Sequence, residues 1–146
     1  MIITDISQLD LTKQYTYADY LAWRMDEMVR IELFNGYIKR LETPWIAHHR
    51  ILNGITRAFY DYFDNHETHE IYRIPLDVRL TKSDKSDHTI TDVVQPDVII
   101  AHKNTLDDAG VVGIPTVLFE IYQSETAHKK MFEKFNIYEA DRKSVV

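Results

Sequence analysis

Two segments, VVQPDVIIAH (residues 93–102) and TVLFEIYQSE (residues 116–125), carry the strongest information on the fold. Each contains an apolar run with the length and composition of a buried strand, and each run carries one carboxylate, Asp97 or Glu120. An ionised carboxylate in an apolar setting costs several kcal/mol unless it is paired, hydrogen-bonded or bound to a metal ion. Two such residues on strands that could be neighbours therefore predict a shared site.

The alternation of side chains along a strand shows which residues would face this site. Glu120 shares a face with Tyr122, and Asp97 shares a face with Gln95. If the two strands pair with these faces aligned, the carboxylates converge on a site that suits Mg²⁺ or Mn²⁺, completed by water and a backbone carbonyl such as that of Ile121. Alternatively, each carboxylate ends its strand and is solvated or bonded to a nearby loop, and spacing alone leaves both interpretations open.

Length and composition limit the classes of protein to consider. The 146 residues predict one domain, residues 1–146, with no apolar run near the ~18 residues that span a membrane and no signal peptide. The absence of cysteine excludes disulfides, thiolate catalysis and cysteine-bound zinc, and it fits a reducing cytoplasm. The net charge of −6 means that any binding of nucleic acid must depend on a local basic patch.

Periodicity and turn residues predict an α/β fold with a mixed central sheet covered by helices. Asn35-Gly36 between two short alternating runs is the strongest hairpin signal. Pro75 interrupts a further strand pattern. The predicted elements are a helix at 16–27, a hairpin at 30–41, a helix at 48–63, a strand at 70–80, neighbouring strands at 93–101 and 117–122, and a helix at 126–140.

The order and spacing of several motifs resemble one known family. Pro96-Asp97, then Glu120, then Lys134 in the following helix is similar to the pattern of the Uma family of restriction endonucleases, within the PD-(D/E)XK nuclease superfamily. The resemblance covers most of the chain. Its other pieces are YTYADYLAW (15–23), IELFNGYI (31–38), HHRILNGI (48–55), PLDVRL (75–80) and GVVGIPTVLFEI (110–121).

The resemblance implies a restriction-endonuclease-like core and metal-dependent hydrolysis of phosphodiester bonds in nucleic acid, with DNA as the expected substrate. Asp97 and Glu120 would be the ligands of Mg²⁺ or Mn²⁺. Lys134 would stabilise the attacking hydroxide and the developing phosphorane charge, and Glu32 would complete the acidic cluster. His48 would contact substrate or a group behind the ligands. A solvated position on the surface is the open alternative for Lys134, Glu32 and His48.

Departures from the family pattern keep a second function open. Tyr122 stands where the superfamily often has lysine, and QS at 123–124 replaces a Ser-Pro pair. Lys130 replaces an aspartate that is frequent in the family, which makes residues 128–134 more basic. The candidate substrate contacts are therefore His48, Gln95 and Lys130. The chain stops at DRKSVV, residues 141–146, where the family continues into a strand. A truncated final strand would leave an open edge and favour a homodimer or larger assembly. The alternative is therefore a non-catalytic member that dimerises or binds nucleic acid.

Overall fold

A computed structural model describes residues 6–23, 30–41, 44–81, 84–122 and 128–141 of the chain. The helices are α1 (Tyr17–Trp23), α2 (Ile46–Phe63) and α3 (His128–Asp141), with 3₁₀ turns at Ile6–Gln8 and Lys103–Thr105. The strands are β1 (Ile31–Phe34), β2 (Tyr37–Arg40), β3 (His69–Arg73), β4 (Asp77–Leu80), β5 (Asp92–Val94), β6 (Val98–His102), β7 (Leu106–Asp107), β8 (Gly110–Val112) and β9 (Val117–Phe119).

The strands form two sheets whose layout confirms the mixed α/β class. The larger has the order β2-β1-β5-β4-β8-β7, in which β4 and β8 are parallel and the other pairs are antiparallel. The smaller has the order β3-β6-β9 and is antiparallel throughout. The predicted hairpin is confirmed as β1-β2, and its turn places Asn35 and Gly36 at φ 50° and 82°. The two strands named first above are also neighbours, since Ile99 pairs with Leu118.

Two of the strands predicted from the sequence are divided between the sheets. The strand predicted at 70–80 becomes β3 and β4, with Pro75 between them, and the strand predicted at 93–101 becomes β5 and β6, with Pro96 between them. Because proline has no N–H to donate to a ladder, the chain bends at each proline and passes from one sheet to the other. The strand predicted at 117–122 is likewise shorter and ends at Phe119, so Glu120 directly follows β9.

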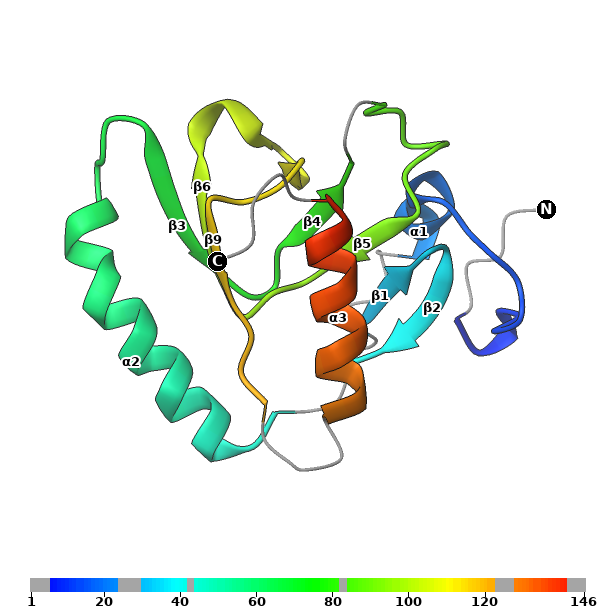
Figure 1. Ribbon diagram of the computed structural model, residues 1–146, viewed down its shortest axis with the longest axis horizontal. Coiled ribbons are helices and arrows are strands. Elements are labelled where there is room, and N and C mark those ends of the chain that lie inside the picture. Colours follow the sequence, from blue (N-terminus) through cyan, green and yellow to red (C-terminus); the bar gives the residue numbers. More distant parts are fainter. Residues whose placement is uncertain (1–5, 24–29, 42–43, 82–83, 123–127, 142–146) are drawn as a thin grey trace.

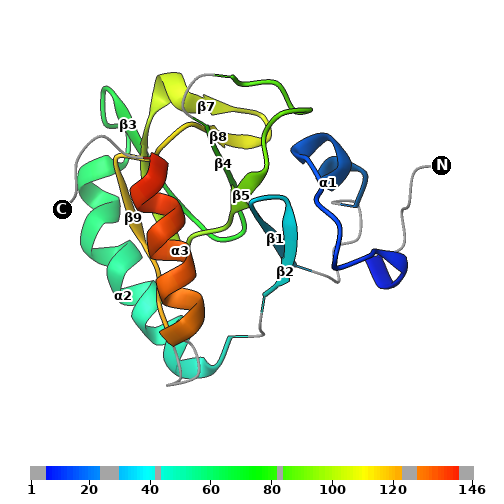
Figure 2. The same cartoon turned by 45° about the vertical axis from the view of Figure 1, so that its right-hand side comes forward.

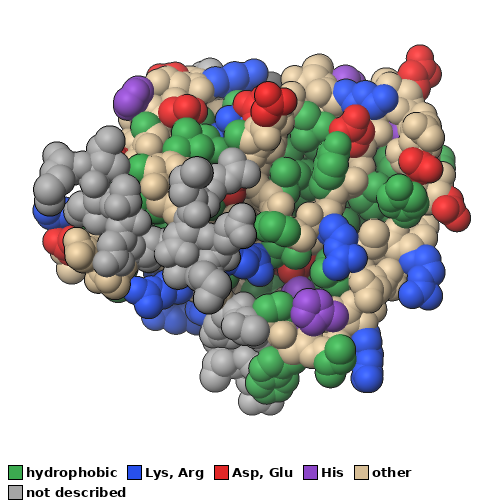
Figure 3. Space-filling view, turned by 180° about the vertical axis from the view of Figure 1, so that it is seen from behind, with side chains coloured by type: hydrophobic (Ala, Val, Ile, Leu, Met, Phe, Trp, Pro, Cys, Tyr) green, Lys and Arg blue, Asp and Glu red, His purple; other side chains and the backbone are tan. Residues whose placement is uncertain are grey.

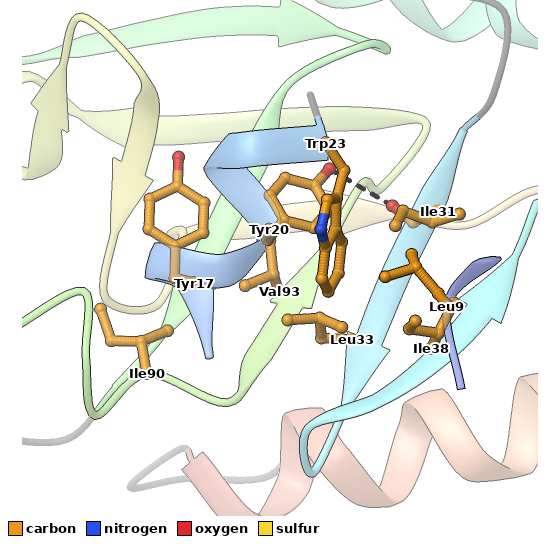
Figure 4. Close-up of a cluster of buried hydrophobic side chains, with 9 residues drawn as sticks. All are labelled: Leu9, Tyr17, Tyr20, Trp23, Ile31, Leu33, Ile38, Ile90 and Val93. Atoms are coloured by element: carbon orange, nitrogen blue, oxygen red, sulfur yellow. Dashed lines mark hydrogen bonds between the residues drawn. The ribbon is translucent and has the colours of Figure 1, made fainter. Parts of the chain in front are cut away.

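The helices occupy different positions around the sheets. Helix α2 contacts β3 and β6 of the smaller sheet, and both ribbon views place β9 between α2 and α3 (Figures 1 and 2). Helix α1 lies on the larger sheet, where Tyr20 and Trp23 pack with Leu33 and Val93 in one hydrophobic cluster (Figure 4). Residues 24–27 of the helix predicted at 16–27 lie outside the described residues. No described helix is both long enough and apolar enough to cross a membrane.

The apolar faces predicted for two helices are only partly buried. In α3 the side chains of Met131 and Phe135 are 40% and 46% exposed, whereas Lys134 is 6% exposed. In α2 the side chain of Tyr62 is 68% exposed, and Leu52 is buried. The prediction that these apolar faces cover the sheet was therefore wrong in detail. The inner face of α3 is partly polar because Lys134 contacts buried carboxylates there.

Candidate functional site

Four residues predicted from the sequence meet at one place, although they come from separate elements. Glu32 lies on β1, Asp97 follows Pro96 between β5 and β6, Glu120 follows β9, and Lys134 lies on α3. Glu32, Asp97 and Lys134 are 2%, 5% and 6% exposed. The interpretation of Lys134 and Glu32 as solvated surface residues does not fit this burial. Buried charges of this kind persist only with partners.

Lys134 joins two of the carboxylates. Its Nζ lies 2.8 Å from Oε2 of Glu32 and 2.8 Å from Oε1 of Glu120. The hydroxyl of Tyr138, one helical turn after Lys134, also donates to Oε1 of Glu120 at 2.5 Å. Two residues of α3 on one face therefore hold Glu120 against β1, because positions i and i+4 of a helix are neighbours.

Asp97 has a different set of partners. Its Oδ1 lies 2.8 Å from Nε2 of His48, and its Oδ2 accepts a hydrogen bond of 2.6 Å from the backbone N–H of Ile121. The carboxylate thus lies next to the peptide that follows Glu120. Nδ1 of His48 is buried and has no hydrogen-bond partner among the described residues. His48 therefore lies behind a carboxylate of the site, with one ring nitrogen still unsatisfied.

The electrostatic environment perturbs these groups strongly. Burial raises the pKa of Glu120 to about 7, even though Lys134 acts to lower it. Burial likewise raises the pKa of Glu32, against the opposing effect of Lys134. Burial alone would lower the pKa of Lys134, but Glu32 and Glu120 outweigh it and the pKa is raised. Lys134 is therefore a fixed positive charge at neutral pH, and Glu120 is poised between its two protonation states.

Gln95 connects the site to a second buried polar group. Its backbone N–H donates to Oε2 of Glu32 at 2.7 Å, and its side-chain amide donates to Oδ1 of Asp77 at 3.0 Å. The hydroxyl of Tyr20 on α1 donates to the same oxygen of Asp77 at 2.9 Å. Gln95, predicted as a substrate contact, is thus part of the support for Glu32.

Asp77 and Tyr138 also belong to this network, although neither was predicted from the sequence as a site residue. Asp77 is 1% exposed. The signal for it was the one used for the first two carboxylates, a single carboxylate in an apolar strand. Tyr138 had a weaker signal, its spacing of four residues from Lys134, which has meaning only once Lys134 is known to point inward.

Glu32, Asp97, Glu120 and Lys134 line a pocket of about 380 Å³. Glu32, Asp97 and Lys134 are buried at its floor, and more exposed basic residues also line it. We call these more exposed residues the mouth cations: Arg30, Lys39, Arg40 and Lys130. They supply a local basic patch on a chain whose net charge is −6, which a nucleic-acid ligand would need. The predicted contacts His48, Gln95 and Lys130 all line this pocket.

The carboxylates fit a divalent cation chemically. In the parts of the chain that the structure describes, no three His, Asp or Glu side chains are grouped so that they could hold a metal ion. Mg²⁺, however, is commonly bound by one or two carboxylates together with water and substrate phosphates. Asp97 and Glu120 supply carboxylate oxygens of that kind. Asp97 accepts a hydrogen bond from the backbone N–H of Ile121, the residue that follows Glu120. Their role as metal ligands remains a prediction.

Comparisons with known proteins bear on the family and on the fold. Residues 17–144 match the model of the family Uma2, described as "Putative restriction endonuclease". The fold resembles the crystal structure of a putative nuclease belonging to DUF820 from Anabaena variabilis, with a TM-score of 0.58 and 15% identity. That match covers 86% of this chain and 68% of the other, and at this identity it shows the fold alone. No curated protein matches the sequence. The expected restriction-endonuclease-like fold is therefore confirmed.

Proposed function

Because this chain belongs to the Uma2 family of putative restriction endonucleases, we propose that it is a metal-assisted nuclease that hydrolyses phosphodiester bonds of DNA. One observation carries the proposal: Lys134 lies between Glu32 and Glu120 at the floor of a pocket lined by cations. Structural ion pairs seldom bury two carboxylates and an ammonium beneath a basic pocket, because the desolvation cost is large.

Each residue has a separate part in the proposed reaction. The mouth cations draw the phosphate backbone toward the pocket. Lys134, held by two carboxylates, presents positive charge to the attacking water and to the phosphorane as its negative charge grows. His48 and the N–H of Ile121 fix the orientation of Asp97. A bound Mg²⁺ would lower the pKa of water and neutralise charge on the phosphate and leaving oxygens.

A second candidate function has an observation of its own in its favour. Lys134 already neutralises much of the charge of Glu32 and Glu120. A pocket satisfied in this way could serve a non-catalytic protein that binds nucleic acid through the mouth cations. In that case the chain would bind DNA equally well with Mg²⁺ and with EDTA, and it would not cleave DNA under either condition.

Plasmid nicking at neutral pH with Mg²⁺, Mn²⁺ or EDTA tests the proposal. We expect cleavage with either metal, none in EDTA, and none with Glu120→Gln, which keeps the shape of the side chain but removes its charge. Glu67→Gln is the matched control, since Glu67 is exposed and outside the pocket, and it should cleave as wild type does. Cleavage that resists EDTA, or an active Glu120→Gln protein, would remove these residues from the mechanism.

Lys134→Met separates binding of the metal from turnover. Without the ammonium the stabilisation of the phosphorane is lost, so nicking should fall by about 10²-fold or more. Titration calorimetry should still detect Mn²⁺, because the carboxylates remain and lose a competing cation. A Lys134→Met protein that folds, binds Mn²⁺ and nicks at the wild-type rate would refute the assigned role of Lys134.

A further inference from the structure

The depth of the pocket limits the form of nucleic acid that can reach its floor. Of the groups assigned to the reaction, Glu32, Asp97 and Lys134 are at most 6% exposed, and the side chain of Glu120 is 13% exposed. They can meet a phosphate only if that phosphate enters the pocket. In a duplex the phosphates lie along a wide convex surface, and a groove alone is about 12 Å across. A pocket of about 380 Å³ is at the small end of the range for ligand sites, so it has room for about one nucleotide at a time.

The walls of the pocket differ from its mouth in chemistry. Phe34, Ile38, Ile74 and Ile121 supply apolar surface, and Tyr122 supplies a half-buried aromatic ring. Apolar and aromatic surface of this kind packs against the face of a base that has left the stack. The mouth cations are in place to meet the phosphates on either side of that base. An unstacked nucleotide has both parts, whereas a stacked duplex exposes only the phosphates.

The surface charge is consistent with this arrangement. Figure 3 shows the reverse side of the molecule, where the visible Asp and Glu side chains lie mostly in the upper half of the view. Lys, Arg, His and hydrophobic side chains dominate the lower half, at the level where α2 begins in Figure 1. His48, in the first turns of α2, lines the pocket. Among the described side chains visible in this view, Asp and Glu are therefore sparse at the level where α2 begins.

We propose that the pocket takes single-stranded nucleic acid and admits one unstacked nucleotide between its apolar wall and the mouth cations. This inference rests on the proposed function of the same pocket and deepens it by naming the form of the substrate. The backbone of the strand runs past Arg40 and Lys130, the base lies against Tyr122, and the phosphate beside it reaches Lys134. A fully paired duplex binds only through the mouth cations, and nicking of a plasmid requires that a nucleotide leaves the stack at the cut site.

Fluorescence anisotropy in EDTA tests the inference without cleavage. The probes are short oligonucleotides of DNA and of RNA, each as a single strand and as a hairpin duplex of the same sequence. We expect the wild-type protein to bind at least one single strand about tenfold or more tightly than its own hairpin. Equal or tighter binding of both hairpins overturns the proposal, and so does binding of free mononucleotides with no gain from a longer strand.

Two pairs of variants locate the binding. Tyr122→Leu should weaken single-strand binding about 5- to 100-fold with an unchanged salt slope, while Tyr122→Phe keeps the ring and should bind as wild type. The logarithm of the binding constant falls linearly with the logarithm of the salt concentration, and Arg40→Ala should make this slope shallower by about 0.7 between about 50 and 200 mM salt. Lys103→Ala, an exposed lysine at the far end of β6 from Asp97, should leave binding unchanged. Unaltered binding by both Tyr122→Leu and Arg40→Ala would overturn the proposal.

The binding and cleavage assays fail independently. A protein that nicks plasmid but prefers the duplex loses only the inference on strand form. A protein that selects single strands through Tyr122 and Arg40 but never cleaves keeps that inference and loses the proposed catalytic function.

Discussion

One ammonium group, that of Lys134, is shared by two buried carboxylates, and this contact governs the charge state of the site. It partly offsets the cost of burying Glu32 and Glu120, yet the pKa of Glu120 still rises to about 7. Lys134 thus lowers the free-energy cost of burying the two carboxylates, and it is also the residue best placed to stabilise charge in the proposed reaction. At the scale of the residue, stability and activity therefore depend on one contact.

The raised pKa of Glu120 predicts a pH dependence of stability. Because the folded state holds this proton more tightly than an ordinary glutamate with a pKa of 4.5, folding is favoured below that value and loses this contribution as pH rises toward 7. The lost free energy of unfolding is about 3 kcal/mol at most. Glu120→Gln cannot titrate and should lack this slope. Urea denaturation of both proteins from acid to neutral pH measures the difference, and parallel curves would contradict the assigned pKa.

At the scale of the element, the β1-β2 hairpin is the support for Glu32. Its turn is fastened on two sides, since the N–H of Gly36 donates to the carbonyl of Thr91 and its carbonyl accepts from the N–H of Tyr15, both at 2.8 Å. A Cβ added at Gly36 would lie 2.9 Å from the carbonyl oxygen of Tyr15, and the residue has φ 82°. Only glycine meets both conditions without strain.

Gly36→Ala should therefore destabilise the protein by about 1–3 kcal/mol, from the strained φ and the backbone clash together. Gly54→Ala is the matched control, because Gly54 lies within α2 and a Cβ there meets nothing within 4 Å. It should stabilise the protein by about 0.5–1 kcal/mol. Chemical denaturation gives both values. A Gly36→Ala protein as stable as wild type would show that the turn adjusts freely.

At the scale of the whole molecule, exposed apolar side chains lie along the smaller sheet and its neighbouring helices. Ile51 and Phe59 of α2 are 50% and 36% exposed, Val117 of β9 is 41% exposed, and Phe135 of α3 is 46% exposed. Among the described residues β9 is also an edge strand, paired on one side only. An apolar edge strand with apolar surroundings is a common site of association between chains.

We therefore expect the protein to form a dimer or larger assembly through β9. Val117→Lys should shift it toward the monomer, because a lysine on an edge strand opposes pairing with another chain. Tyr37→Lys is the control, since Tyr37 is similarly exposed at 39% but lies on β2 in the other sheet. Size-exclusion chromatography with light scattering, from micromolar to tens of micromolar protein, measures the mass. A wild-type monomer across that range would refute the prediction.

Most of the secondary-structure elements, the family, and several of the residues that gather in the pocket are recognisable from the sequence. Hairpin and helix signals arise from neighbours in the chain, such as Asn35-Gly36, and a lone carboxylate in an apolar strand is visible without any structure. These features are local, so a single sequence reveals them. Asp97 and Glu120 were found in this way, and the structure brings them to the same pocket.

How these residues and elements meet is set by the tertiary structure. It placed the segments on either side of Pro75 and of Pro96 in different sheets, directed Lys134 inward and placed His48 behind Asp97. It also left much of the apolar face of α3 exposed. Each outcome depends on contacts between residues far apart in the chain, whose energies are set by packing and desolvation rather than by local periodicity. The local sequence around a helical lysine does not show whether its side chain faces water or a pair of buried carboxylates.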